Sequence, residues 1–217
     1  MIQFTIKTSD GNIRCTSPAS WSELNIGQLI KLETEWDRES ATQLFSIVTG
    51  VDEELLKSSK DNGLEDTMLA ICAFAYDQPQ WDALPRPAKL QIGDEFYNTP
   101  DNIDKKTLGQ KIMVSQIAIK EDVDLVKSIP KIIAIYMQEV IDGKYDDTRL
   151  AEVEESILTS PAIDCYGLAL FFFQESGNLI NIGEMSLTKS QPLIVPMEKL
   201  LKGLAKLRVY HDTQTLT

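Results

Sequence analysis

The first half of the chain alternates between apolar and polar residues and then changes period. From Gln3 to Thr8 the residues alternate, the polar residues 9–12 predict a turn, and residues 13–16 predict the second strand of a hairpin. After Trp21 the apolar positions recur every three or four residues, which predicts helices. These helices are expected over about residues 24–36, 40–49, 53–56 and 64–76.

The prolines Pro79, Pro85 and Pro87 interrupt this pattern, and they predict a linker because proline cannot continue a helix. After the linker the same order of elements begins again. Residues 90–97 predict a short hairpin. Four helices are then expected, beginning at about Thr107, Asp124, Asp146 and Ser160, with Pro130 either kinking or splitting the second of them and Phe171–Phe173 ending the last.

The two halves share several local signals in one order. Asn25 and Thr107 each stand three residues before a glutamine, Gln28 and Gln110, which is the spacing of a capping box at the start of a helix. A glycine expected as a left-handed helix end follows in each half, and then an aspartate expected as a helix cap: Gly50 and Asp52, Gly143 and Asp146. The shared order favours an internal duplication over two modules that use common helix signals independently.

These patterns predict an α+β fold in which helices dominate. We expect an N-terminal module of a hairpin plus helices over residues 1–80 and a second, similar module over residues 88–176. The remaining residues, 177–217, contain many glycine, asparagine, serine and proline residues, and they predict an extended arm followed by a helix.

The helix at the end of the arm is amphipathic and locally basic. Its apolar residues recur at spacings of three and four and its lysines lie between them, so it is a candidate partner-binding element. The helix either folds back onto its own chain or docks on another copy or another protein. Its candidate binding residues are Met197, Leu200, Leu201, Leu204, Leu207, Lys199, Lys202 and Lys206.

Composition excludes several classes of partner. The net charge of −12 opposes direct binding to a nucleic acid backbone. The apolar runs are far shorter than the roughly 20 residues that span a bilayer, so we expect no membrane insertion. The first seven residues lack the pattern of a secretory signal, which favours the cytoplasm as the compartment.

Candidate chemistry is sparse. The single histidine, His211, lies near the C-terminus, which argues against histidine-based catalysis and histidine-rich metal sites. Cys15, Cys72 and Cys165 are far apart and odd in number, which favours reduced, buried thiols. No phosphate-binding or dinucleotide-binding glycine pattern occurs. We therefore expect no enzyme activity and no cofactor, although a site made only of carboxylates is an alternative.

Several stretches resemble a known class of viral proteins. The chain resembles tail assembly chaperones of tailed bacteriophages and related small structural proteins. The resemblance rests on residues 21–32, 47–55, Ile132–Tyr136, 143–146 and Gly167–Phe173. The resemblance spans about residues 20 to 175. The chain is long for a simple tail chaperone and carries an additional arm, and both features suit a ring, connector or packaged protein of the virion.

The resemblance implies a bacteriophage structural or morphogenesis protein that acts through protein–protein contacts. Its partners would be other phage structural proteins and further copies of itself. It would be present in the host cytoplasm during assembly and, as a particle component, in the virion. An enzyme with an unrecognised carboxylate site and a bacterial adaptor protein are the alternatives.

Overall fold

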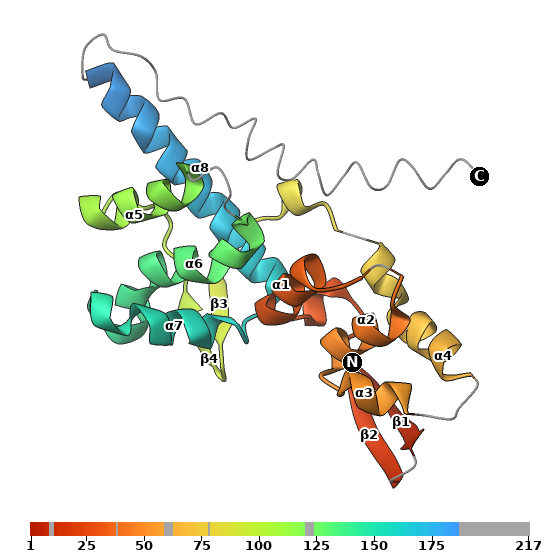
Figure 1. The fold of residues 1–217 in the computed structure, drawn as a ribbon. Helices are drawn as coiled ribbons and strands as arrows, with labels where there is room; N and C mark the ends of the chain where they lie inside the picture. The colour runs from red at the N-terminus through yellow and green to blue at the C-terminus, as the bar shows by residue number, and fades with distance from the viewer. Residues whose placement is uncertain (9–10, 38, 59–62, 78, 120–123, 187–217) are drawn as a thin grey trace, which may run out of the picture.

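The computed structural model confirms an α+β fold in which helices predominate. It describes residues 1–8, 11–37, 39–58, 63–77, 79–119 and 124–186. Within this part of the chain, two separate antiparallel hairpins accompany eight α-helices (Figure 1). The hairpins stand one at the beginning of each predicted module. Four α-helices follow each hairpin along the chain.

The N-terminal module begins with an antiparallel hairpin of seven residue pairs, from Ile2 opposite Ser17 to Thr8 opposite Gly11. Its second helix is the centre of the module, because that helix contacts the second strand and each of the other three helices. The elements are β1 Ile2–Thr8, β2 Gly11–Ser17, the 3₁₀ turn η1 Trp21–Glu23, α1 Ile26–Thr34, α2 Ala41–Thr49, α3 Glu53–Lys57, α4 Leu64–Ile71 and the 3₁₀ turn η2 Ala73–Tyr76.

The C-terminal module repeats this plan with longer helices. Its second helix again contacts the second strand of the hairpin and the other three helices. The elements are β3 Lys89–Ile92, β4 Glu95–Asn98, α5 Leu108–Ile119, α6 Leu125–Asp142, the 3₁₀ turn η4 Asp147–Arg149, α7 Leu150–Ile157 and α8 Ala162–Ser186. The helix-ending glycines predicted for the two second helices, Gly50 and Gly143, both have positive φ angles, 73° and 75°.

One hydrophobic core runs through both modules and through the predicted linker. The linker contains the 3₁₀ turn η3, Trp81–Ala83, and the Trp81 ring is buried between two other rings. Its centroid lies 5.4 Å from that of Trp21 and 4.7 Å from that of Tyr166. Trp21 in turn donates from Nε1 to the Asp77 carbonyl at 2.7 Å. Aromatic packing therefore joins the linker to both modules, which the prolines alone did not indicate.

Helix α8 corrects two predictions. The last helix was expected to end at Phe173, and an arm was expected from residue 177, but α8 continues to Ser186. It is anchored midway, where the buried Tyr136 and Ser176 hydroxyls are hydrogen-bonded at 3.0 Å. Packing on α5 and α6 outweighs the weak helix propensity of its glycine and asparagine residues. The boundaries at residues 80 and 88 stay predictions about folding units.

Two smaller expectations are also settled. Pro130 does not split its helix, because α6 continues through it. Ser160 was expected to cap the last helix, but α8 begins only at Ala162, so Ser160 lies before the cap position. Its carbonyl oxygen accepts instead from the Ile26 N–H at 2.9 Å.

Candidate partner-binding surface

The predicted partner-binding residues of the basic C-terminal helix, from Met197 to Leu207, all lie outside the described residues. The two modules provide an internal reference, because equivalent helices can be compared residue by residue.

Both predicted capping boxes are present. In α1 the Asn25 side chain accepts from the Gln28 N–H at 2.8 Å, and the Gln28 side chain accepts from the Asn25 N–H at 2.9 Å. In α5 the Thr107 hydroxyl accepts from the Gln110 N–H at 3.2 Å, and the Gln110 side chain accepts from the Thr107 N–H at 2.9 Å. These bonds satisfy backbone donors that a helix start otherwise leaves without partners.

Each glutamine also fastens its helix to the next one. Gln28 Nε2 donates to the Val48 carbonyl at the end of α2, at 2.7 Å. Gln110 Nε2 donates to the Ile135 carbonyl within α6, at 2.9 Å. In both modules the glutamine side chain therefore caps the first helix and bonds to a carbonyl of the second helix. That carbonyl lies at the end of α2 in one module and in the middle of α6 in the other.

The start of α1 is covered by the corner between α7 and α8. The Ile26 N–H donates to the Ser160 carbonyl and the Gly27 N–H to the Leu158 carbonyl at 3.0 Å, while the Ala162 N–H donates back to the Leu24 carbonyl at 2.8 Å. The Ile26 side chain is fully buried there. The C-terminal module thus supplies the hydrogen-bond partners for the first turn of the N-terminal module's first helix.

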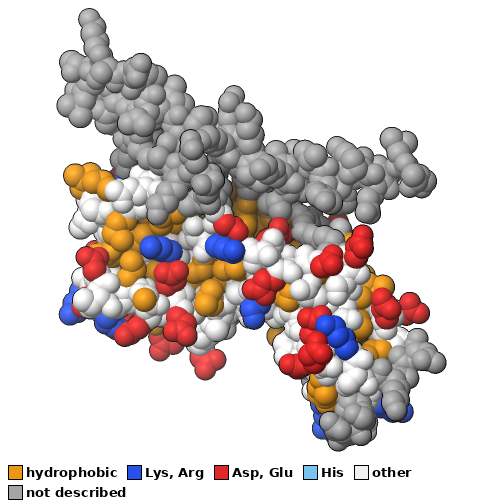
Figure 2. All heavy atoms as spheres, viewed as in Figure 1, with side chains coloured by type: hydrophobic (Ala, Val, Ile, Leu, Met, Phe, Trp, Pro, Cys, Tyr) orange, Lys and Arg blue, Asp and Glu red, His pale blue; other side chains and the backbone are white. Residues whose placement is uncertain are grey.

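The start of α5 is open. Aligned on the capping boxes, Leu108 occupies the position of Ile26 and Ile112 that of Ile30. Leu108 is 73% exposed and Ile112 46% exposed, one helical turn apart, whereas Ile26 is fully buried and Ile30 partly buried. Figure 2 shows apolar side chains gathered where α5 and α6 lie. We call Leu108 and Ile112 the open face of α5.

The glycines in the first turns of α1 and α5 differ in how closely other atoms approach them. A Cβ atom added to Gly27 would lie 3.2 Å from the Leu158 carbonyl oxygen, so Gly27 permits the close approach of the α7–α8 corner. A Cβ atom added to Gly109 would meet only its neighbour Thr107, at 3.8 Å. Close packing therefore explains Gly27, whereas no such close approach occurs at Gly109 among the described residues.

Charged residues precede the open face of α5 and lie in its first turns. Lys105 is exposed just before the helix, and Lys111 lies in its first turns, where Nζ donates to the Asp104 carbonyl at 3.3 Å. Lys106 is buried and paired with Glu139 at 2.6 Å, which joins this corner to α6. The exposed residues just before the helix, Asp104 and Lys105, carry opposite charges, so the apolar start of α5 is bordered by both signs of charge.

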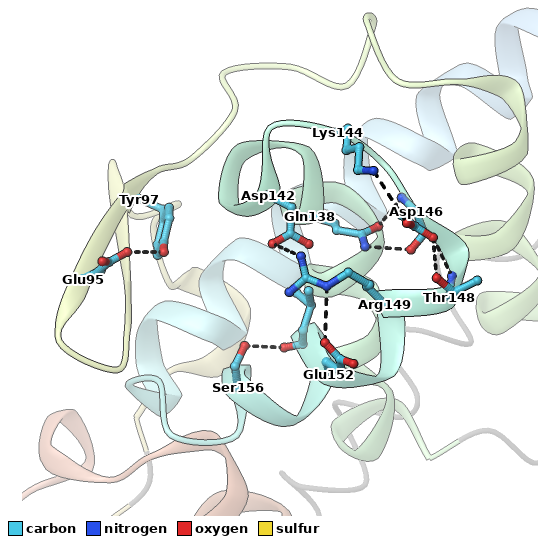
Figure 3. A network of polar contacts seen from close by, with 11 residues as sticks. Glu95, Tyr97, Gln138, Asp142, Lys144, Asp146, Thr148, Arg149, Glu152 and Ser156 are labelled. Carbon is cyan, nitrogen blue, oxygen red and sulfur yellow. Dashed lines mark hydrogen bonds and ion pairs between the residues drawn. The ribbon is translucent and has the colours of Figure 1, made fainter.

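A polar network braces the corner between α6 and α7 (Figure 3). The buried Gln138 side chain donates to the Asp146 carbonyl at 2.7 Å and accepts from the Asp146 N–H at 3.1 Å. Arg149 bridges Asp142 at 2.9 Å and Glu152 at 3.3 Å. This corner is longer than its counterpart between α2 and α3, and the network supplies side-chain partners for its backbone.

Titration behaviour around the network follows from these contacts. Hydrogen bonds from the Thr148 hydroxyl and N–H lower the pKa of Asp146. The hydrogen bond between Glu95 and Tyr97 raises the pKa of Tyr97 (Figure 3). Burial raises the pKa of Tyr145 to about 12. The groups therefore remain in their ordinary charge states near neutral pH, which fits a structural brace.

The three cysteines are buried free thiols, as predicted. Burial raises the pKa of Cys72 to about 12 and raises the pKa of Cys165 as well. Thiolate is the reactive form, so these thiols are poor nucleophiles. Among the described residues, no three Cys, His, Asp or Glu side chains are grouped so that they could hold a metal ion.

No helix within the described part of the chain is long and apolar enough to cross a membrane. Comparisons of the chain with known protein families, curated proteins and solved structures found no match.

The sequence contained part of the signal for the open face. Leu108 and Ile112 are visible as apolar positions one turn apart, yet Ile26 and Ile30 show the same spacing and are covered. The additional signal is the apolar character of α5 on more than one side, since the buried Val114 lies on the side of the helix opposite Ile112, two residues away. A helix that is apolar beyond its core-facing stripe indicates a second contact surface.

Proposed function

We propose that the chain is a non-enzymatic structural or morphogenesis protein of a tailed bacteriophage that works through protein–protein contacts. It acts either as a ring, connector or packaged component of the virion or as a tail assembly chaperone. The observation that carries the contact function is the open face of α5, whose counterpart on α1 is covered by another module.

Physical chemistry supports a binding role for this face. Leu108 and Ile112 are large apolar side chains one turn apart, and removing them from water against a partner is favourable. The assignment to a bacteriophage draws on the resemblance of residues 21–32 and 47–55 to phage tail proteins. The proposed partners are other phage structural proteins and further copies of the chain, in the host cytoplasm during assembly.

The proposal is tested by locating the protein in an infected culture. Particles of the phage that encodes it are purified and their proteins are quantified by mass spectrometry, and in parallel an affinity-tagged chain is recovered from infected cells. A virion component is present in the particles in several copies. A chaperone is absent from mature particles but is recovered together with tail proteins. Absence from the particles together with recovery of no phage protein would contradict the proposal.

A matched pair of variants links this experiment to the structure. Leu108→Asp introduces a charge into the open face, and Phe96→Asp introduces the same charge at another exposed apolar residue, on β4. Phe96 is 64% exposed, so neither change disturbs the core. Leu108→Asp should remove the protein from particles or from its tail-protein complexes, and Phe96→Asp should not.

A further inference from the structure

We infer that the groove between β1 and α4 binds residues 192–196 from a second copy of the chain, which add a strand to the free edge of β1. The inference deepens the proposed function by naming one contact between copies, and it rests on that proposal. It concerns a surface of the N-terminal module, separate from the open face of α5. The lining of the groove, the free strand edge and the sequence of the segment support it.

A groove of about 160 Å³ lies between the first strand and the fourth helix of the N-terminal module. One wall consists of four successive residues of β1, Phe4–Lys7. Because successive side chains of a strand point to opposite faces, a groove that touches all four runs along the edge of the strand. The opposite wall is one stripe of α4 at spacings of three and four. The remaining lining residues are Phe45, Leu64, Thr67, Met68 and Ile71.

The edge of β1 along the groove is available to another strand. Among the described residues, β1 pairs only with β2. Antiparallel pairing leaves alternate residues of β1 with backbone N–H and C=O groups that point away from β2. Within the described ranges, no backbone hydrogen bond joins β1 to a residue outside its hairpin. An extended segment in the groove would supply partners for these groups, which is recognition by strand addition.

The walls of the groove also define its occupant. Because α4 stands opposite the strand edge, the groove suits one isolated strand better than the edge of a second sheet. The lining is mostly apolar, and an apolar cavity of about 150 Å³ holds a group the size of benzene. Charge does not select the occupant, since Lys7 on β1 and the exposed Glu65 and Asp66 on α4 have opposite signs. The occupant is therefore a short extended segment with a large apolar side chain.

The chain contains a segment of this kind beyond α8. Leu193, Ile194 and Val195 are consecutive branched aliphatic residues between Pro192 and Pro196. Isoleucine and valine favour extended strands, and proline stands at strand ends because it lacks a backbone donor. In an added strand, Leu193 and Val195 would point to one face, toward the groove, and Ile194 to the other.

The segment comes from a different copy than the groove. Helix α8 begins against α1, where the Ala162 N–H donates to the Leu24 carbonyl, and it continues for 25 residues, or about 37 Å, to Ser186. Figure 1 shows the end of α8 and the β1–β2 hairpin on opposite sides of α1. The stretch from Ser186 to Leu193 spans at most about 25 Å, which is too short to return to β1. Each copy therefore gives one strand and receives one, and such a heterologous contact closes into a ring or continues as a filament.

The first test measures binding of a fluorescent peptide of residues 189–198 to the full-length protein by fluorescence anisotropy. We expect saturable binding. Leu193→Asp in the peptide should weaken it at least about tenfold, because a charge replaces a buried apolar side chain. Ile194→Asp, on the opposite face of the strand, is the control and should weaken it less than about threefold. A peptide that does not bind would overturn the inference.

Variants of the protein locate the binding site of the peptide. Thr67→Arg places a long charged side chain in the groove and should weaken peptide binding at least about tenfold. Ala70→Arg makes the same change at an exposed residue of α4 outside the groove lining, and it should leave binding unchanged. Equal binding by the two variants would overturn the inference. Displacement of the peptide by an unlabelled peptide of residues 197–208 would assign the groove to the C-terminal helix and would also overturn it.

The second test identifies the copy that supplies the strand. Full-length Thr67→Cys and Val195→Cys proteins are mixed and oxidised, and disulfide-linked dimers are measured by non-reducing electrophoresis. We expect a mixed dimer, and Ala70→Cys in place of Thr67→Cys should give at least about tenfold less. A chain that carries both Thr67→Cys and Val195→Cys and cross-links only within itself would overturn the inference. Particle analysis tests the proposed function separately, since a virion protein that fails both binding tests would refute only this contact.

Discussion

The starts of α1 and α5 are nearly the same structure in different surroundings. Each has a capping box, a glycine in the first turn and a glutamine that reaches the following helix. The first turn of α1 lies against the α7–α8 corner, and the first turn of α5 leaves Leu108 exposed. Local sequence thus determines how a helix begins, and the neighbouring module determines which of its faces is covered.

The corners that follow show a second difference. In the N-terminal module Gly50, Val51 and Asp52 join α2 to α3 directly, and the Asp52 side chain caps the helix through the Leu55 N–H at 3.0 Å. In the C-terminal module the join is longer and includes η4, and Gln138 holds its backbone. A repeated plan therefore tolerates a longer connection where a buried side chain replaces the hydrogen bonds that a tight turn provides.

The largest expected contrast is between Ile26→Ala and Leu108→Ala. Ile26 is fully buried, so its truncation should lower the free energy of unfolding by about 2–5 kcal/mol. Leu108 is mostly exposed, and its truncation should change stability by less than about 0.5 kcal/mol in dilute solution. Urea unfolding followed by circular dichroism measures both. Equal losses would show that the two positions are not differently covered.

The next contrast concerns the two glutamines. Gln110→Ala removes three side-chain hydrogen bonds at a buried site and should cost about 2 kcal/mol. Gln28→Ala removes two at a partly exposed site and should cost about 1 kcal/mol. Gln116, an exposed residue in the same helix, is the control, and Gln116→Ala should have little effect. Thermal unfolding in which Gln110→Ala matches the control would mean that the bonds to Thr107 and Ile135 do not stabilise the fold.

The caps themselves should behave alike. Thr107→Ala and Asn25→Ala each remove the side-chain acceptor of a capping box, and each should destabilise by about 1 kcal/mol. Thr107→Ser keeps an acceptor and serves as the control for the first. An unfolding midpoint that is the same for Thr107→Ala and the wild type would show that Thr107 is not an effective cap.

The smallest contrast is between the two glycines. Gly109→Ala places a methyl group 3.8 Å from Thr107, with no closer contact among the described residues, and gains helix propensity, so it should stabilise by about 1 kcal/mol. Gly27→Ala brings the methyl group against the Leu158 carbonyl, which should cancel this gain. The two variants should therefore differ by about 1 kcal/mol in chemical denaturation. A Gly27→Ala protein as stable as the Gly109→Ala protein would contradict the close approach at α1.

The sequence predicted features that depend on a few neighbouring residues. Both hairpins, both capping boxes, and the left-handed glycines Gly50 and Gly143 follow from local hydrogen bonding and backbone preference, and all are present. The continuation of α8 past Phe173 was missed because tertiary contacts, including the one between Tyr136 and Ser176, override local propensity. The buried position of Trp81 was missed for the same reason.

The candidate surface could be predicted only in part. Leu108 and Ile112 were recognisable as apolar positions, but the identical spacing of Ile26 and Ile30 gave no reason to expect one pair covered and the other open. That distinction depends on the packing of the C-terminal module against the N-terminal one, which no local pattern encodes. The basic C-terminal helix, which the sequence did single out, stays a prediction.

The central claim is that α5 presents an unfilled copy of the contact that α1 makes within the chain. Amide hydrogen exchange measured by mass spectrometry at low and high protein concentration tests it directly, because it compares residues 24–30 with residues 106–114 in the same sample. The account predicts that the first segment is protected at both concentrations and that the second gains protection only as concentration rises. Protection of the second segment that is independent of concentration would contradict the claim.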